Sequence, residues 1–186
     1  MKKVCLICGI ALLVTALAAL AVWQYGIRRA ETQGEAYLAT LRSLLPPIQG
    51  AVPEARRDNT MPILSVDGKE FVGILEWPRF ASALPVCANW AETFPSRFSG
   101  SVYDRSMQIG ATSQAGQYDF FREISVGDAL FFTDMEGNRY SYTVTDLHYE
   151  SQINGDTLGR EEAALTLFIQ NIYAFDYLVV FCNTPN

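Results

Sequence analysis

Hydrophobic positions divide the chain into a long apolar run at the N-terminus, a short stretch at helical spacing and a series of strand-like segments. The run covers residues 4–23, in which no side chain is charged and Thr15 is the only polar one. As an α-helix, a run of this length extends about 30 Å, the thickness of the hydrocarbon core of a bilayer. We therefore predict a membrane anchor within residues 1–27.

The charges beside this run indicate its orientation. Lys2 and Lys3 precede it, and Arg28 and Arg29 follow it close to two glutamates, so the excess of positive charge is nearly balanced. The free N-terminal amine favours a cytoplasmic N-terminus, which places the rest of the chain outside the cell. The alternatives are a signal peptide cleaved near the small residues of 19–21, which exports the same part, and the opposite orientation, with the domain in the cytoplasm.

Residues 30–45 place apolar side chains at the spacing of an α-helix, and Pro46 and Pro47 follow them. We predict a short amphipathic helix, separate from the anchor, whose apolar stripe packs against the domain or a neighbouring protein. Residues 46–60 are rich in proline and charge, which is typical of a linker, so 28–60 is interpreted as helix and linker. The stripe consists of Tyr37, Leu38, Leu41, Leu44 and Leu45.

From residue 61 onward, short runs of β-branched and aromatic residues alternate with turn signals. Residues 63–66 and 70–76 flank Asp67-Gly68, which predicts a hairpin because glycine tolerates the positive φ of a tight turn. Residues 129–134 and 139–147 flank a four-residue turn with a glycine and predict a second hairpin.

Two more strands are predicted at 165–170 and 178–182. Strands joined by turns, without alternating helices, favour an antiparallel barrel or sandwich, and the 186 residues, 49% of them hydrophobic, suffice for one such core over 61–186. The net charge is −6, and residues 1–27 hold two lysines and no acid, so the remainder is still more acidic. Nucleic acid is therefore not an expected partner.

Six segments carry a family resemblance through their order and spacing: 73–78, 84–86, 97–101, 107–110, 126–134 with Gly137 and Tyr140, and 165–168. Over about residues 61–182 they resemble the sortase family, in particular its class B-like members. An N-terminal anchor is usual for that family. The resemblance implies a mostly β fold, an eight-stranded β-barrel preceded by a transmembrane helix and the short amphipathic helix, outside a Gram-positive cell.

Sortases are cysteine transpeptidases that cut a sorting-signal peptide and pass its acyl group to an amine. This chemistry needs a thiolate nucleophile, an imidazole acid and a cation for the oxyanion. At the matching positions this chain has Gln170 for the cysteine, Thr112 for the histidine and Tyr177 for the arginine, and Ile169 where the family prefers threonine. The resemblance thus implies that no catalytic residue is intact. We expect Gln170 and Thr112 to face one another across the mouth of the barrel, with Tyr177 beside them.

The predicted exported part contains two cysteines, Cys87 and Cys182. Outside the reducing cytosol they can pair, and we predict a disulfide between them. Two inert thiols, or a thiol that replaces the missing nucleophile, are the alternatives.

The remaining candidate groups predict no metal or cofactor site. The one histidine, His148, falls where the family has no acid or base, and we interpret it as a surface or rim residue. Acidic residues gather in the loop before residue 165, near which some sortases bind calcium, but their spacing matches no EF-hand and we expect them to be solvated. The loop contains Glu150, Asn154, Gly155, Asp156, Glu161 and Glu162.

These observations predict a membrane-anchored, catalytically inactive sortase-like protein that serves as a binding or assembly factor. Its expected partners are sorting-signal peptides, surface proteins or active sortases, together with the lipid around its N-terminal helix. The first alternative is an unorthodox transpeptidase that uses another nucleophile, such as Ser113. The second is a structural envelope domain whose peptide groove has closed.

Overall fold

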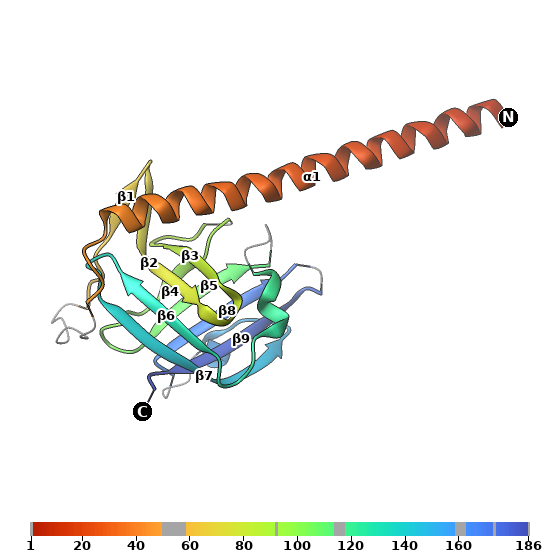
Figure 1. Ribbon diagram of the computed structural model, residues 1–186. Coiled ribbons are helices and arrows are strands. Elements are labelled where there is room, and N and C mark those ends of the chain that lie inside the picture. Colours follow the sequence, from red (N-terminus) through yellow and green to blue (C-terminus); the bar gives the residue numbers. More distant parts are fainter. Residues whose placement is uncertain are drawn as a thin grey trace.

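The computed structural model describes residues 2–49, 59–91, 93–113, 118–158, 163–172 and 174–185. A long helix at the N-terminus leads to a β-barrel (Figure 1). The elements are α1 (Lys2–Leu44), β1 (Leu64–Val66), β2 (Lys69–Trp77), η1 (Pro78–Phe80), β3 (Ser82–Cys87), β4 (Ser96–Ser99), β5 (Met107–Thr112), η3 (Asp119–Glu123), β6 (Ala129–Asp134), β7 (Arg139–Glu150), α2 (Gly155–Leu158), β8 (Leu165–Asn171) and β9 (Asp176–Asn183).

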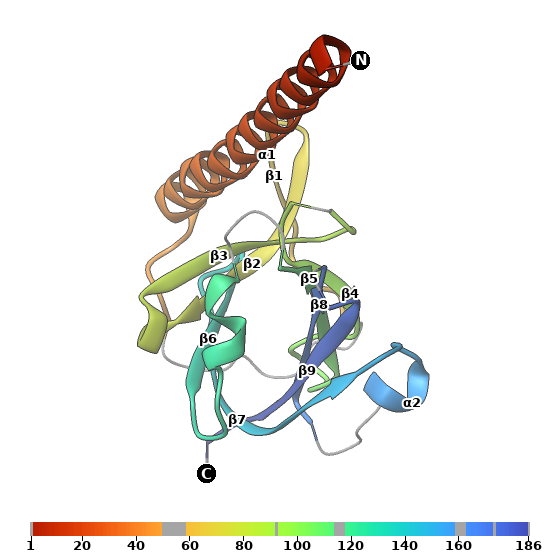
Figure 2. The same ribbon diagram turned by 90° about the vertical axis from the view of Figure 1, so that its right-hand side faces the viewer.

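The strands follow the order β1-β2-β3-β4-β5-β8-β9-β7-β6, and β6 pairs back with β2. Strands β2 to β9 therefore close into a ring, which Figure 2 shows nearly end-on, and β1 extends β2 as a hairpin arm outside it. The predicted eight-stranded barrel is confirmed. It is mixed rather than antiparallel, however, because the β3–β4 and β5–β8 pairs are parallel.

Both predicted hairpins are present. The β1–β2 turn places Asp67 at φ 50° and Gly68 at φ 75°, and the β6–β7 turn places Gly137 at φ 83°. These angles lie in the left-handed region that glycine adopts without steric cost.

The barrel interior is filled by every second residue of each strand, as the alternation of side chains in a β-strand requires. On β8, Leu165, Leu167 and Ile169 point into this core and are at most 1% exposed. Thr166, Phe168 and Gln170 consequently point to the outer face. This alternation decides which side chains can form a surface site.

The N-terminal helix is one continuous element of 43 residues, so the predicted break between an anchor and a separate amphipathic helix is wrong. Gly26 and Gly34 are the weak helix formers near the expected break, and each disfavours a helix by only about 1 kcal/mol relative to alanine. The helix ends at Leu44, directly before Pro46 and Pro47, as predicted. At 1.5 Å per residue α1 is about 65 Å long.

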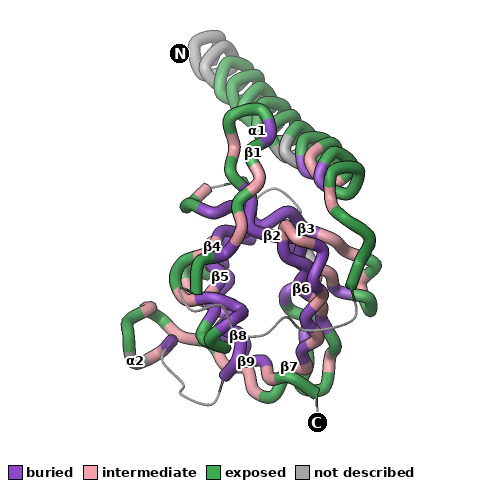
Figure 3. Tube along the Cα trace, turned by 90° about the vertical axis from the view of Figure 1, so that its left-hand side faces the viewer, coloured by how far each residue is buried: buried purple, intermediate pink, exposed green. Residues whose placement is uncertain are grey.

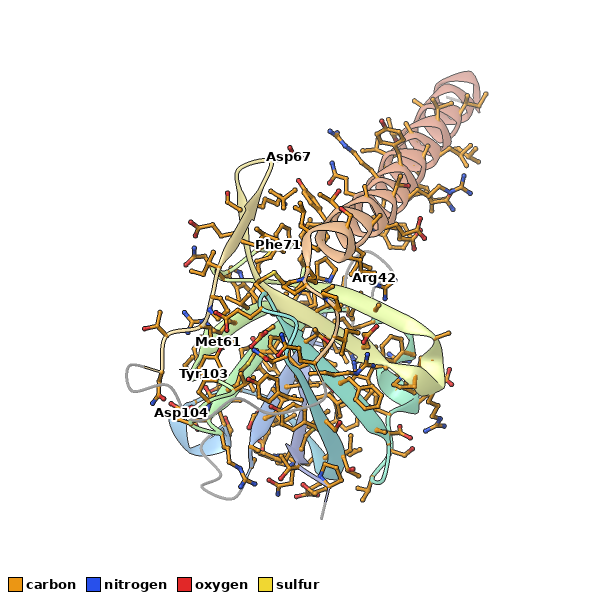
Figure 4. The ribbon with its side chains drawn as sticks, turned by 60° about the vertical axis from the view of Figure 1, so that its left-hand side comes forward. Arg42, Met61, Asp67, Phe71, Tyr103 and Asp104 are labelled. Atoms are coloured by element: carbon orange, nitrogen blue, oxygen red, sulfur yellow. The ribbon has the colours of Figure 1, made fainter. Side chains whose placement is uncertain are left out.

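The C-terminal part of α1 packs on the arm and on β3. Leu41 is fully buried there, and the Tyr37 ring lies 5.2 Å from that of Phe71 and 5.8 Å from that of Phe94. Figure 4 shows Phe71 on the arm side of the helix, and Figure 3 shows that α1 is exposed before Gly34 wherever its side chains are described. The predicted stripe thus packs against the domain, except that Leu44 is exposed.

An ion cluster lies at the end of the same contact. The carboxylate of Glu76 on β2 lies 3.1 Å from Nη2 of Arg42 and 2.9 Å from Nη2 of Arg139. The helix, β2 and β7 are thereby linked at one point.

Within the described residues, α1 is the one helix that is long and apolar enough to cross a membrane, and its apolar window makes no buried contact with the barrel.

Candidate functional site

The three positions matched to a sortase triad lie in one row across neighbouring strands. Thr112 at the end of β5 is the register partner of Gln170 on β8, and Gln170 is the partner of Tyr177 at the start of β9. The row continues to Glu150 at the end of β7. Strands β5 and β8 are parallel and end together, and the antiparallel β9 begins beside them. Thr112 is thereby brought to one edge of the barrel with residues 58 and 65 positions later in the chain.

The side chains of this row point to the outer face, because their neighbours Ala111, Ile169 and Leu178 point into the core. They therefore lie side by side on the barrel wall rather than across its mouth, which corrects the expected arrangement. All three are partly exposed.

The row next to it is apolar. Gly110, Phe168 and Val179 are consecutive register partners on β5, β8 and β9. Gly110 is required here, because a Cβ at this position would lie 2.5 Å from Cζ of Phe168 and 2.7 Å from Cζ3 of Trp90. The rings of Phe168 and Trp90 thus lie directly over the β5 backbone.

The Phe168 ring also packs edge-on against Phe98 of β4, with centroids 5.3 Å apart. Trp90 is 53% exposed and Phe98 is 58% exposed, so an aromatic surface adjoins the row of Thr112, Gln170 and Tyr177. On the other side, the β7–β8 connection covers Phe168 and Val179 with Leu158 of α2 and Ala163.

Backbone hydrogen bonds fix the end of β8. The N–H of Ser113 donates to the carbonyl oxygen of Gln170 at 2.8 Å, and the N–H of Ile172 donates to Oγ of Ser113 at 3.2 Å. Ser113 is only 6% exposed. Its hydroxyl oxygen is engaged in holding this turn, a poor arrangement for attack on a substrate carbonyl.

His148 lies on the outer face of β7, where it is half-buried. Its Nε2 is 3.3 Å from Oε1 of Glu150, and its ring lies 5.5 Å from that of Phe181. Its register partner is Val179, so β9 separates it from β8 and its backbone is about 10 Å from that of Phe168. The strand order thus places β9 between the imidazole and Gln170 of β8.

Cys87 and Cys182 are free, which contradicts the predicted disulfide between them. Cys182 points into the barrel core, whereas Cys87 belongs to the cluster beneath α1, so the barrel wall separates their environments. Burial raises the pKa of Cys87 to about 11, against a smaller lowering by Lys69, and raises the pKa of Cys182 further. Neither thiol is ionised near neutral pH, so neither is a reactive nucleophile.

In the acidic loop, Asn154 caps α2. Its Oδ1 accepts the N–H of Thr157 at 2.8 Å, and its own N–H donates to Oγ1 of Thr157 at 2.8 Å. No group of three or more His, Cys, Asp and Glu side chains suitable for a metal occurs within the described ranges. Glu161, Glu162 and the side chain of Asp156 lie outside them.

One buried polar centre, around Asp134, was not predicted from the sequence. Asp134, at the end of β6, is fully buried and accepts hydrogen bonds from the hydroxyls of Tyr103 at 3.1 Å and Tyr140 at 3.5 Å. It also accepts the backbone N–H groups of Glu136 and Asn138. A buried carboxylate is tolerated only when it is paired in this way, and here it fixes the β6–β7 turn. The Asp-x-x-Gly-Asn order of the turn was the available signal.

Comparison with solved structures assigns the fold. Neither a protein-family model nor a curated protein sequence matches the chain, but 71 chains of solved structures do. A lid mutant of Streptococcus agalactiae sortase C1 is 19% identical, with 86% of this chain and 88% of that chain covered and a TM-score of 0.55. A lid mutant of Corynebacterium diphtheriae sortase A is 13% identical, with 63% and 72% covered and a TM-score of 0.53.

Sortase C from Clostridium perfringens, solved with the C-terminal cell wall sorting motif, is 16% identical, with 62% of this chain and 71% of that chain covered and a TM-score of 0.52. The barrel is therefore sortase-like. Identities at this level establish the fold and leave the chemistry to be argued from the residues.

Proposed function

We propose that this protein is a membrane-anchored, extracellular sortase-like protein without transpeptidase activity, which binds or assembles surface proteins or active sortases. The observation that carries the proposal is the row formed by Thr112, Gln170 and Tyr177. The resemblance assigns these three positions to the histidine, cysteine and arginine of a sortase, and their register pairing, which brings them to one edge of the barrel, supports that assignment.

The chemistry of the row supports inactivity. A carboxamide cannot form a thioester, a threonine hydroxyl does not titrate near neutral pH and so cannot serve as the acid or base, and a phenol carries no positive charge for an oxyanion. The groups that could act instead are poorly placed: Ser113 is buried in a turn, Cys87 and Cys182 have raised pKa values, and His148 is beyond β9.

The aromatic surface beside the row supports a binding role. Trp90 and Phe98 expose large apolar areas next to Phe168, and exposed aromatic side chains of this kind are common in peptide-binding surfaces. Because a relative with this fold was solved with a sorting motif, we propose sorting-signal peptides as the first ligand class to test.

The packing of the β7–β8 connection favours a second candidate, a structural envelope domain. Leu158 and Ala163 bury Phe168 and Val179 on the outer face, which narrows the surface open to a peptide. The two candidates differ in whether a peptide binds at all.

Peptide binding to the full chain in nanodiscs separates them. Fluorescence anisotropy with labelled sorting-signal peptides should show saturable binding that weakens in Phe98→Ala. The matched control is Ile63→Ala, which removes an equally exposed side chain before β1. Absence of binding by the unaltered protein, or equal weakening by both variants, would favour the structural role.

A further inference from the structure

An exposed phenylalanine forms the tip of the β8–β9 turn. Phe175 is 84% exposed, more than any other large hydrophobic side chain described in the barrel. Its φ is 57°, and its N–H donates to the carbonyl oxygen of Asn171 at 2.9 Å, so the turn is closed and holds the ring outward. A phenylalanine in the left-handed region is unusual, and its outward position calls for a physical reason.

The turn projects from the end of the barrel that lies nearest the apolar part of α1. Strands β5 and β8 are parallel and end together at this edge, and η3 follows β5 by a few residues. Phe120 of η3 and Phe80 of η1 line a cavity of about 340 Å³ against Glu31 and Glu35 of α1. In Figure 1 the β8–β9 turn likewise lies on the side toward which α1 runs to its N-terminus.

The dimensions of α1 place this edge near a bilayer. Glu31 is eight residues from Trp23, which corresponds to about 12 Å along the helix axis. Trp23 and Tyr25 are exposed at the end of the apolar run, where aromatic side chains typically mark the membrane interface. The β8–β9 turn extends beyond the strand ends, which shortens the distance between the barrel edge and the membrane interface.

The connection between helix and barrel keeps this geometry. The helix is continuous, and Leu41, Tyr37 and the ion pair of Arg42 with Glu76 hold it against the arm and β2. The barrel therefore has little freedom to swing its other end toward the membrane.

We propose that the β8–β9 turn inserts Phe175 into the interfacial region of the bilayer that α1 crosses. The partner of this surface is lipid, because α1 leaves the barrel along the same edge and the bilayer that it crosses therefore lies beside the turn. The row of Thr112, Gln170 and Tyr177 then opens at the membrane surface, so a peptide that reaches it must lie close to the headgroups. The proposal rests on the retained anchor of the proposed function, and it does not depend on whether the row is catalytic.

Photo-crosslinking of the full chain tests this contact. The chain is reconstituted in nanodiscs of palmitoyl-oleoyl phosphatidylcholine and phosphatidylglycerol, with p-benzoylphenylalanine replacing Phe175, Phe98 or Leu13 in separate preparations. Phe98 is the matched control, since it is also an exposed phenylalanine but lies beside the start of β5, toward the opposite edge. Leu13 reports the anchor itself.

After irradiation, intact mass should reveal lipid adducts at positions 175 and 13, with roughly tenfold less at position 98 because that side chain faces water. Adducts at position 13 without any at 175, or equal labelling at 175 and 98, would overturn the turn contact while leaving the anchor in place. A lack of adducts at position 13 would overturn the anchor and, with it, this inference.

Discussion

Gln170 and Thr112 are register partners on the parallel strands β8 and β5, and the N–H of the next residue, Ser113, donates to the carbonyl oxygen of Gln170 at 2.8 Å. This pairing joins two residues that are 58 positions apart and fixes their backbones relative to one another. Any catalytic residues introduced at these two positions to restore acyl transfer would be held in this same pairing.

Restoring one residue of the row should restore no activity. Gln170→Cys supplies a thiol without a proton donor or a cation, and groups that act as one catalytic unit are not additive. We expect no peptide-derived mass adduct on the single variant, and an adduct only on the triple variant Thr112→His, Gln170→Cys, Tyr177→Arg. Intact-mass spectrometry after incubation with a sorting-signal peptide checks this. Full acylation of Gln170→Cys alone would show that another group already serves as the acid.

Gly110→Ala should destabilise the barrel, because the added Cβ would clash with the rings of Phe168 and Trp90. Overpacking of this kind costs about 1–3 kcal/mol in the free energy of unfolding. The control is Gly155→Ala, since a Cβ there meets nothing within 4 Å. Urea unfolding of both variants in detergent, followed by tryptophan fluorescence, gives the comparison. Equal stability of the two variants would contradict the placement of the rings.

Leu41→Ala should loosen the attachment of α1 to the barrel. Leu41 is fully buried, with 0% of its surface accessible. Truncation of such a leucine lowers the free energy of unfolding by about 2–5 kcal/mol. Leu44→Ala is the matched control, because Leu44 is 57% exposed and its loss should cost less than about 0.5 kcal/mol. Hydrogen exchange of residues 34–45 should rise only in Leu41→Ala. Similar exchange in both variants would argue against the docked helix.

The cysteines should react slowly until the solution is strongly alkaline. The pKa of Cys87 is raised to about 11, so its thiol stays protonated below that pH and becomes nucleophilic as the pH approaches it. Iodoacetamide labelling of the native protein between pH 7 and pH 10 should therefore be slow at Cys87 and slower at Cys182, with both labelled after unfolding without reductant. If neither is labelled in the unfolded, unreduced protein, the two are paired and the free state is contradicted.

Much of the fold follows from local sequence signals. Asp67-Gly68 and the turn around Gly137 determine two hairpins through their backbone angles, and the alternation in 165–170 determines which side of β8 is buried. The continuity of α1 could not be predicted in the same way, because the apolar run and the amphipathic stripe are separate hydrophobic patterns. The charged residues between them belong to neither pattern, so no hydrophobic periodicity indicates a helix across them.

The site depends on long-range pairing that periodicity does not encode. Nothing in the local sequence around Thr112 or Gln170 indicates that β5 and β8 are parallel neighbours; their juxtaposition was expected only from the family resemblance. The disulfide prediction failed for a related reason. It relied on two cysteines in the part predicted to be exported, but the pleat directs Cys87 outward beneath α1 and Cys182 inward.

We propose that the row of Thr112, Gln170 and Tyr177 cannot carry out acyl transfer. The most direct test incubates the unaltered full chain in nanodiscs with a sorting-signal peptide and an amine acceptor, beside an active sortase as positive control, and measures intact mass and product. If the row is inactive, the mass of the chain stays unchanged and no product forms, while the active sortase turns over. A peptide-derived adduct on the unaltered chain that disappears when one residue, such as Ser113 or Cys87, is replaced by alanine would contradict it.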